Sequence, residues 1–180
     1  MTWLRAIVVA VVSLAAVPAS ANDQLAVVLL KAISYERGLA SRAGDQVVIA
    51  VPVPEGRANP RFFKSLKRVE KVRLAKKAIS VSRVDYADPS RLTGALEAVS
   101  ADFVFTSAEL SAEDLLAVLR VCAQSKVPSV GVSKMLVEKG VSLGVELVGK
   151  KPRIFVNVKT SKSQGASYSS DLLELAVPVR

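Results

Sequence analysis

The chain has 180 residues, with 25 Lys and Arg against 16 Asp and Glu, no histidine and a single cysteine, Cys122. These counts exclude Cys/His zinc sites, Ser–His and Cys–His dyads, internal disulfides and dithiol redox pairs. The net charge of +9 favours anionic partners or surfaces.

The first 21 residues have the three-part layout of a secretory signal peptide. A basic residue precedes a mostly apolar stretch, residues 6–17, and Ala19 and Ala21 supply the small residues before the expected cleavage site. The apolar stretch is shorter than the roughly 20 residues of a membrane-spanning helix, and no cysteine follows it that could carry a lipid. We therefore expect export and removal of residues 1–21. We expect residues 22–180 to form a single domain. Because the removed segment holds one basic residue and no acid, the net charge of this domain is +8.

Helix and strand patterns alternate along the rest of the chain. A first helix is expected at about residues 24–41, where apolar residues recur at helical spacing and Asn22 and Asp23 can cap the start. Residues 46–53 form a continuous apolar run, which is typical of a strand covered on both faces in a parallel sheet. The pair Asn59-Pro60 predicts the start of a second helix, since a cap residue followed by proline is a common helix start.

The same alternation continues to the C-terminus. Short helices are expected to start near residues 88, 111 and 133, and a final helix to span residues 161–175. Further strands are expected at residues 79–84, 102–107, 128–132, 141–148 and 153–158, the last two joined by a tight turn as a hairpin. The sequence therefore predicts a single α/β domain. It has a mostly parallel sheet flanked by helices on both faces, a C-terminal β-hairpin and a final helix.

The most charged stretch, residues 61–77, holds eight basic residues and one acid. Its candidate binding residues, of which the last four share one face of the expected second helix, are Arg61, Lys64, Lys67, Arg68 and Lys71. They suit an acidic protein surface or anionic lipid headgroups, although a solvated helix face would show the same pattern. Nucleic acid is disfavoured, because no aromatic residues are interleaved with the charges.

No stretch carries a recognisable catalytic or cofactor motif. The loop after the first strand reads Pro-Val-Pro-Glu-Gly, which lacks the glycines of a dinucleotide-binding loop. The acid pairs Asp85/Asp88 and Glu113/Asp114 fit turns and helix starts. Cys122 lies on the apolar side of its helix, where an inert buried thiol is expected. The sequence therefore predicts a protein that is not an enzyme and that holds no cofactor and no metal.

A binding cleft can be placed from the expected topology alone. In open parallel sheets, ligands collect at the carboxyl ends of the strands. These ends are expected at residues 52–56, 85–88, 106–109 and 132–134. The residue types at these positions do not identify a ligand.

The last third of the chain carries a more specific pattern. A strand at residues 144–148 and a turn precede a second strand, which contains Phe155 and leads to Asn157. Residues 165–176 then end in a Ser-Ser-x-Leu-Leu-x-Leu-Ala pattern. This ending resembles that of the YfiR family of exported bacterial proteins, and residues 25–35 and 102–132 are similar to the start and the middle of that family. The apolar residues of this ending are expected in the core: Phe155, Leu172, Leu173 and Leu175.

The resemblance implies a periplasmic regulator. The namesake of the family restrains a membrane-bound diguanylate cyclase, an enzyme of cyclic-di-GMP signalling, by binding its periplasmic sensor domain. Two features of the family are missing from this chain. Residues 40–44 stand where a Trp-Pro pair usually follows the first helix, and Cys122 is the only cysteine, where the namesake has paired cysteines. Redox control of the namesake's kind is therefore excluded.

The leading hypothesis is a non-catalytic periplasmic regulator that binds and restrains the periplasmic domain of an inner-membrane diguanylate cyclase or sensor kinase. An anionic membrane surface and a second copy of the chain are further candidate partners. The alternative is a periplasmic small-molecule binding protein associated with a transporter. Such proteins usually have two lobes around a cleft, and a single domain of residues 22–180 argues against them.

Overall fold

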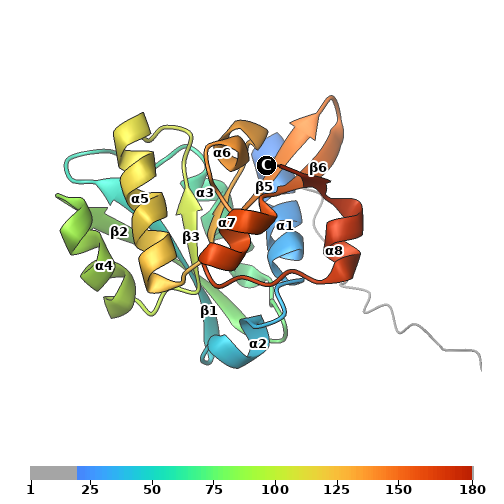
Figure 1. The fold of residues 1–180 in the computed structure, drawn as a ribbon, viewed down its shortest axis with the longest axis horizontal. Helices are drawn as coiled ribbons and strands as arrows, with labels where there is room; N and C mark the ends of the chain where they lie inside the picture. The colour runs from blue at the N-terminus through green and yellow to red at the C-terminus, as the bar shows by residue number, and fades with distance from the viewer. Residues whose placement is uncertain (1–19, 180) are drawn as a thin grey trace, which may run out of the picture.

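A computed structural model describes residues 20–179 of the chain. Most of the expected signal peptide, residues 1–19, lies outside the described residues, so its removal stays a prediction. The described residues form one seven-stranded sheet with helices between the strands (Figure 1). Its strands are β1 (Gln46–Pro54), β2 (Ala78–Tyr86), β3 (Phe103–Thr106), β4 (Ser129–Gly131), β5 (Leu143–Val148), β6 (Lys151–Val156) and β7 (Val177–Pro178).

The order of strands across the sheet is β2-β1-β3-β4-β5-β6-β7. Every neighbouring pair is parallel except β5 and β6, which form an antiparallel hairpin. This arrangement confirms the predicted α/β class, with its mostly parallel sheet and C-terminal hairpin. Strand β7 was not expected; it pairs in parallel with the end of β6 through Phe155 and Val177.

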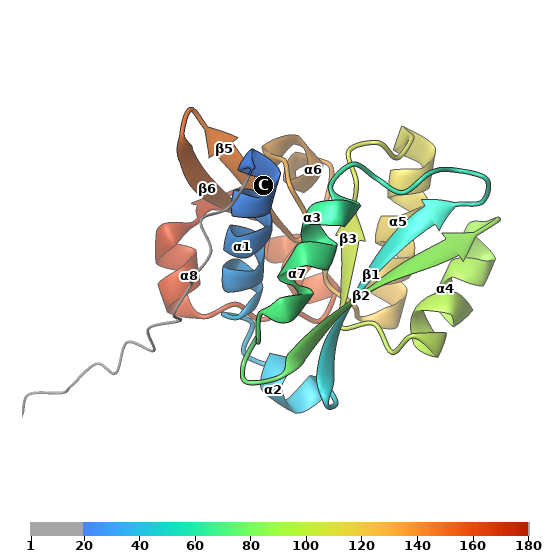
Figure 2. The same cartoon turned by 180° about the vertical axis from the view of Figure 1, so that it is seen from behind.

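The helices cover both faces of the sheet. They are α1 (Ala21–Ile33), α2 (Leu39–Arg42), α3 (Phe63–Arg68), α4 (Pro89–Ala98), α5 (Ala112–Ser125), α6 (Lys134–Glu138), α7 (Val158–Ser163) and α8 (Ser170–Leu175), with one 3-10 turn, η1 (Val69–Lys71). Helices α1 and α3 lie on the face seen in Figure 2, and α4 and α5 lie on the face seen in Figure 1. Strand β1 is therefore buried on both faces, as its continuous apolar run predicts: Ile49 joins the core under α1, and Ala50 joins the core under α4 and α5.

The first helix is shorter than predicted. It ends at Ile33, is capped by Ser20 rather than by Asn22 or Asp23, and is followed by a turn before α2. That turn is fixed by residues far along the chain, because the backbone N–H groups of Arg37 and Ser169 donate to the carbonyl oxygens of Ser167 and Tyr35. Contacts of this range override local helical periodicity.

The second helix starts later and ends earlier than predicted: it begins at Phe63, with Phe62 rather than Asn59 at the N-cap position. Helix α3 ends at Arg68, η1 follows, and Ala75 and Lys76 adopt left-handed conformations in the turn that leads to β2. Like charges at four-residue spacing destabilise a helix, and they recur through this stretch.

The predicted final helix is two short helices. Helices α7 and α8 are separated by Gly165, whose φ of +79° suits glycine and where a Cβ would lie 3.1 Å from the carbonyl oxygen of Lys126. The expected core positions are correct for Phe155 and Leu172, which are buried. They are wrong for Leu173 and Leu175, which are 40% and 68% exposed because α8 lies at the edge of the molecule.

Candidate functional site

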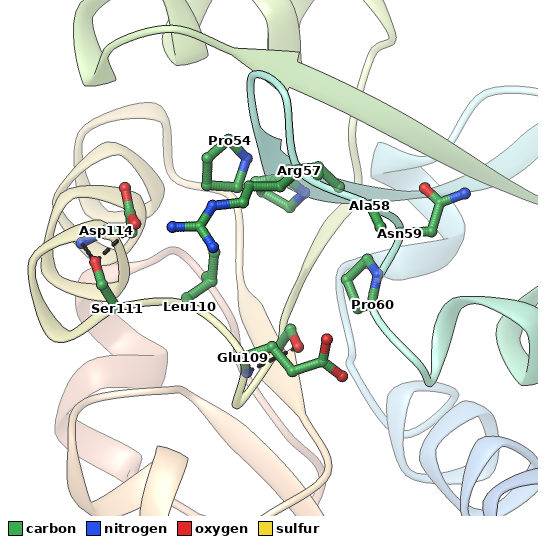
Figure 3. A pocket seen from close by; sticks show the side chains of 12 residues that line it. Pro54, Arg57, Ala58, Asn59, Pro60, Glu109, Leu110, Ser111 and Asp114 are labelled. Atoms are coloured by element: carbon green, nitrogen blue, oxygen red, sulfur yellow. Dashed lines mark hydrogen bonds between the residues drawn. The ribbon is translucent and has the colours of Figure 1, made fainter.

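A cleft of about 410 Å³ opens at the carboxyl ends of β1 and β3 (Figure 3). Strand β2 lies on one side of β1, and the next strand in sequence, β3, lies on the other side. The cleft therefore lies at the point where the strand order reverses. Open α/β sheets commonly bind ligands at such a position. The two walls of the cleft are the end of β1 with the loop that follows it, residues 52–60, and the segment after β3 with the start of α5, residues 107–114.

The first wall is held in place by an arginine of the neighbouring strand β2. Arg83 donates from Nη1 to Oδ1 of Asn59 and from Nη2 to the carbonyl oxygen of Arg57, both at 2.9 Å. Its Nε also donates to Asp85 at 2.9 Å, and this pairing lowers the pKa of Asp85 and raises that of Arg83. Gly56 has a φ of +77°, which permits the turn that starts the loop. The wall is thus shaped before any ligand arrives.

The second wall is tied to the first and to the start of α5. The Glu109 carboxylate accepts a hydrogen bond from the backbone N–H of Arg61 at 3.0 Å, across the cleft. Ser111 caps α5 as predicted, since its Oγ accepts from the backbone N–H of Asp114 at 3.0 Å. The Asp114 carboxylate accepts from Ser111 at 2.7 Å and from the Tyr86 hydroxyl at 3.2 Å. Burial, together with the nearby charge of Asp114, raises the pKa of Tyr86.

Charges of both signs face this cleft. Figure 3 shows the Arg57 guanidinium beside Leu110 and Asp114, and the Glu109 carboxylate on the other side, below Pro60. Within residues 20–179, no hydrogen bond or ion pair engages the Arg57 guanidinium. The positions of the strand ends were expected from the sequence, but these charged residues were not singled out. Arg57 lies one residue beyond the expected strand end, and Asp114 was read only as a helix-start residue.

Some basic residues of the second helix form ion pairs within the protein, and others do not. Arg68 forms an ion pair with Asp23 at 2.7 Å, and Lys67 forms one with Glu70 at 2.8 Å. The nearby Ser65 hydroxyl and the Arg68 guanidinium, which donates to Asp23, lower the pKa of this carboxyl group. The three candidates that remain exposed and without a hydrogen bond or ion pair from their side chains, among the residues described, are Arg61, Lys64 and Lys71.

Lys77 of the same stretch has a structural role. Its Nζ donates to the carbonyl oxygens of Ala40, Ala43 and Gly44, at the C-terminal end of α2. A cation at this position also suits the helix dipole. Fewer basic residues of this stretch are therefore free to contact a partner than the number of charges in residues 61–77 suggests.

A second groove, of about 440 Å³, lies between α1 and β6. It is lined mainly by apolar side chains, with two cations among them: Val28, Lys31, Ala32, Tyr35, Pro152, Arg153, Ile154, Leu175 and Val177. Residues from both ends of the domain meet here, which explains why no local sequence pattern indicated the groove.

The remaining reactive groups fit structural roles. Cys122 is fully buried, and burial raises the pKa of its thiol to about 12. Asp88 caps α4 by accepting from the backbone N–H groups of Ser90 and Arg91. In the described part of the chain, no three Cys, Asp or Glu side chains come close enough together to hold a metal ion. Nor is any helix described there both long and apolar enough to cross a membrane.

Solved structures share this fold at low sequence identity. A conserved domain protein from Vibrio cholerae O1 biovar El Tor is 15% identical, with a TM-score of 0.58 over 89% of this chain and 60% of that one. An ABC domain from Streptococcus pneumonia, solved in complex with L-Trp, is 13% identical, with a TM-score of 0.61 over 87% of this chain and 62% of that one. A ligand-free, open substrate-binding protein with adhesive properties from Clostridium difficile is 16% identical, with a TM-score of 0.55 over 80% and 58%.

This chain thus spans about three fifths of the length of these proteins, and the likeness concerns the fold. No curated protein matches it in sequence. A family model described as YfiR/HmsC-like (DUF4154) matches residues 6–177, almost the whole chain. The chain therefore belongs to the YfiR/HmsC-like family.

Proposed function

We propose that this protein is a non-catalytic periplasmic regulator that binds and restrains the periplasmic domain of an inner-membrane signalling protein, of the diguanylate cyclase or sensor kinase type. The family match over residues 6–177 is the observation that carries the proposal. Two further observations support it. The signal-peptide layout of residues 1–21 favours export, and the only cysteine is buried with a raised pKa, which disfavours thiol chemistry.

The exposed cations around α3 offer a surface for such a partner. Arg61, Lys64 and Lys71 lie on the α3 side of the sheet, and their charges are not neutralised by described neighbours. Complementary charge mainly speeds association and selects partners, so an acidic periplasmic domain would be favoured at this surface. An anionic membrane surface would be attracted by the same charges.

The proposal is tested by capture and reconstitution. Tagged protein is used to isolate partners from native membranes, and the purified periplasmic domain of any captured signalling protein is then titrated by biolayer interferometry. We expect one inner-membrane cyclase or kinase to be captured, and its output to rise when the gene for this protein is deleted. Capture of no such protein, together with unchanged output in the deletion strain, would overturn the proposal.

Paired charge reversals show whether the α3 surface takes part. The variant Lys64→Glu/Lys71→Glu should weaken binding of that domain roughly tenfold or more. The matched control is Lys159→Glu/Lys162→Glu, which removes two exposed lysines of α7. We expect this control to bind as the unmodified protein does. If Lys64→Glu/Lys71→Glu binds the domain as tightly as the control variant does, the cations around α3 do not contact the partner. The proposed regulatory function would not be affected by this result.

A second function, small-molecule binding in association with a transporter, is favoured by one observation. The fold resembles substrate-binding proteins, and the cleft lies at the strand ends where such a fold can hold a ligand. This chain spans about three fifths of the length of those proteins, and residues 20–179 form one sheet with helices on both faces. Loss of uptake of a solute in the deletion strain, with no change in signalling output, would support this second function instead.

A further inference from the structure

We propose that the cleft between the ends of β1 and β3 binds a small zwitterion, a molecule that carries both a carboxylate and an ammonium group. Binding itself does not depend on the regulatory function proposed above. The idea that this ligand is the signal read by the regulator rests on that function. The argument uses the charges, walls and size of the cleft.

The carboxylate end of the ligand is assigned to Arg57. Its guanidinium lies in the cleft, and no described residue engages it (Figure 3). Arg57 is an exposed residue, and its guanidinium presents planar donors that match a carboxylate in pairs. The start of the 14-residue helix α5 lies on the same side, next to Ser111, and its positive end favours an anion there.

The ammonium end is assigned to Glu109. One of its oxygens accepts from the backbone N–H of Arg61 at 3.0 Å, which fixes the carboxylate across the cleft from Arg57. Its other oxygen forms no hydrogen bond with the described residues. Asp114 adds a second negative charge to the lining, although the hydroxyl groups of Ser111 and Tyr86 already donate to its carboxylate.

This balance of charge selects the chemical class. One cation and two carboxylates line the cleft, so a dianion such as inorganic phosphate would meet net repulsion. A simple amine would leave Arg57 unpaired, and a simple carboxylate would leave Glu109 unpaired. Only a ligand with both groups matches both ends of the cleft.

The walls set the size and the side chain of the ligand. A volume of about 410 Å³ falls within the usual range for small-molecule sites, which is roughly 300–1,000 Å³. Apolar wall residues give contact surface for a hydrocarbon side chain: Pro52, Pro54, Pro60 and Leu110. Because proline fixes its own backbone angle and Arg83 holds the loop, little ordering entropy should be lost on binding.

The test uses matched ligands that each lack one charge. Isothermal titration calorimetry and thermal unfolding are run with L-leucine and L-phenylalanine, with the corresponding amines, isoamylamine and phenethylamine, and with the corresponding acids, 4-methylpentanoate and 3-phenylpropanoate. Inorganic phosphate is included as a simple anion. We expect at least one amino acid to bind and to raise the unfolding temperature, and its amine and acid to bind at least tenfold more weakly.

Variants locate the site. Arg57→Gln and Glu109→Gln should each weaken amino-acid binding roughly tenfold or more, since each removes one charge and the glutamine at 109 can still accept from Arg61. Arg57→Lys keeps the charge and loses the planar donors, so an intermediate loss is expected. Lys159→Gln, on the exposed surface of α7, is the control and should bind as the unmodified protein does.

Several results would overturn the proposal: no shift with either amino acid, equal binding by the acid or amine alone, or unchanged binding by Arg57→Gln. Failure of zwitterion binding with intact capture of a signalling protein would overturn this inference alone. Binding of a zwitterion, with no signalling partner captured and unchanged signalling output in the deletion strain, would leave the cleft as a site and overturn the regulatory function. Unliganded unfolding temperatures show that each variant is folded.

Discussion

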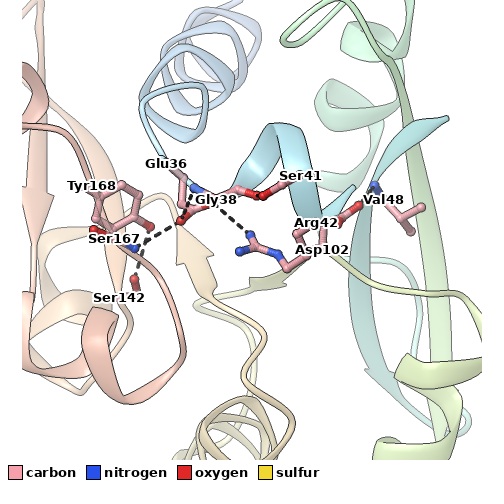
Figure 4. Close-up of polar contacts among 9 residues, drawn as sticks. All are labelled: Glu36, Gly38, Ser41, Arg42, Val48, Asp102, Ser142, Ser167 and Tyr168. Carbon is pink, nitrogen blue, oxygen red and sulfur yellow. Dashed lines mark hydrogen bonds and ion pairs between the residues drawn. The ribbon is translucent and has the colours of Figure 1, made fainter. Parts of the chain in front are cut away.

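The carboxylate of Glu36 joins three segments of the chain at one point (Figure 4). It accepts from the backbone N–H groups of Gly38 and Ser167, both at 3.1 Å, and forms an ion pair with Arg42 at 3.1 Å. Arg42 in turn lies over the ring of Phe103, with its guanidinium carbon 5.6 Å from the ring centre. No local sequence pattern predicts this role of Glu36, because its partner Ser167 is 131 residues away from it along the chain.

Replacement of Glu36 should therefore be costly. Glu36→Ala leaves two N–H groups and the Arg42 guanidinium, whose side chain is 30% exposed, without their acceptor, and we expect a loss of about 2–4 kcal/mol in the free energy of unfolding. Glu36→Gln keeps an acceptor and should lose less. Urea denaturation gives both values, and Glu97→Ala on the exposed side of α4 is the control, expected to change stability little. Equal stability of Glu36→Ala and the control would show that the junction does not hold the fold.

Asp102 should make the stability of the protein depend on pH. It is buried at the start of β3, its Oδ2 accepts from the backbone N–H of Val48 at 2.9 Å, and burial raises its pKa. The folded protein thus binds this proton more tightly than the unfolded chain. The contribution of Asp102 to stability is fully present below its unfolded pKa of about 4, and is lost as pH rises through the folded pKa.

Asp102→Asn keeps an acceptor for Val48 and carries no charge that must be buried. The variant should therefore gain stability relative to the unmodified protein as pH rises from about 4 toward neutrality. Urea denaturation at a series of pH values measures the difference in free energy of unfolding. A difference that stays constant over this range would contradict the raised pKa.

At the scale of elements, the sequence predicts strands better than helix lengths. Strand β1 was expected almost to its observed ends, because nine residues that are mostly apolar leave few alternatives in a buried position. Helices α1 and α3 were overextended, since their periodicity continues past the points where they end. A distant loop ends α1, which no local spacing shows, whereas the like charges at four-residue spacing in α3 can be read from the sequence.

Gly144 tests how α6 packs on the sheet. A Cβ at this position of β5 would lie 2.5 Å from Cγ2 of Val137 and 3.0 Å from the carbonyl oxygen of Ser133. Gly144→Ala should force α6 away from β5 and lose about 1–3 kcal/mol of stability. Gly94→Ala is the matched control: no atom lies within 4 Å of its Cβ, and a helical alanine in α4 should add about 0.5–1 kcal/mol. A stable Gly144→Ala variant would contradict the close packing of α6.

At the scale of the whole molecule, the alternation of strands and helices was sufficient to predict the architecture and where its cleft lies. What the sequence could not show is the return of the C-terminal segment to the first helix. Tyr168 pairs with Glu36, and β7 extends the sheet beyond the hairpin. The charges of the candidate cleft were recognised only in part: Glu109 falls within the strand end expected at residues 106–109, whereas Arg57 lies one residue beyond the end expected at 52–56.

The mature N-terminus is a prediction about the whole chain. Cleavage after Ala21 would remove Ser20, whose Oγ accepts from the backbone N–H of Asp23 at 3.2 Å and caps α1. The core contacts of α1 begin at Leu25 and would survive, so the fold should persist with a frayed first turn. Mass spectrometry of the exported protein should show residues 22–180.

The lost cap has a measurable consequence. A chain of residues 22–180 should unfold with about 1 kcal/mol less free energy than residues 20–180, and Ser20→Ala in the longer chain should reproduce most of that loss. Urea denaturation of the three proteins compares them directly. An exported protein that begins at Ser20, or that keeps residues 1–21, would show that the cap is part of the mature molecule and that the expected cleavage site is wrong.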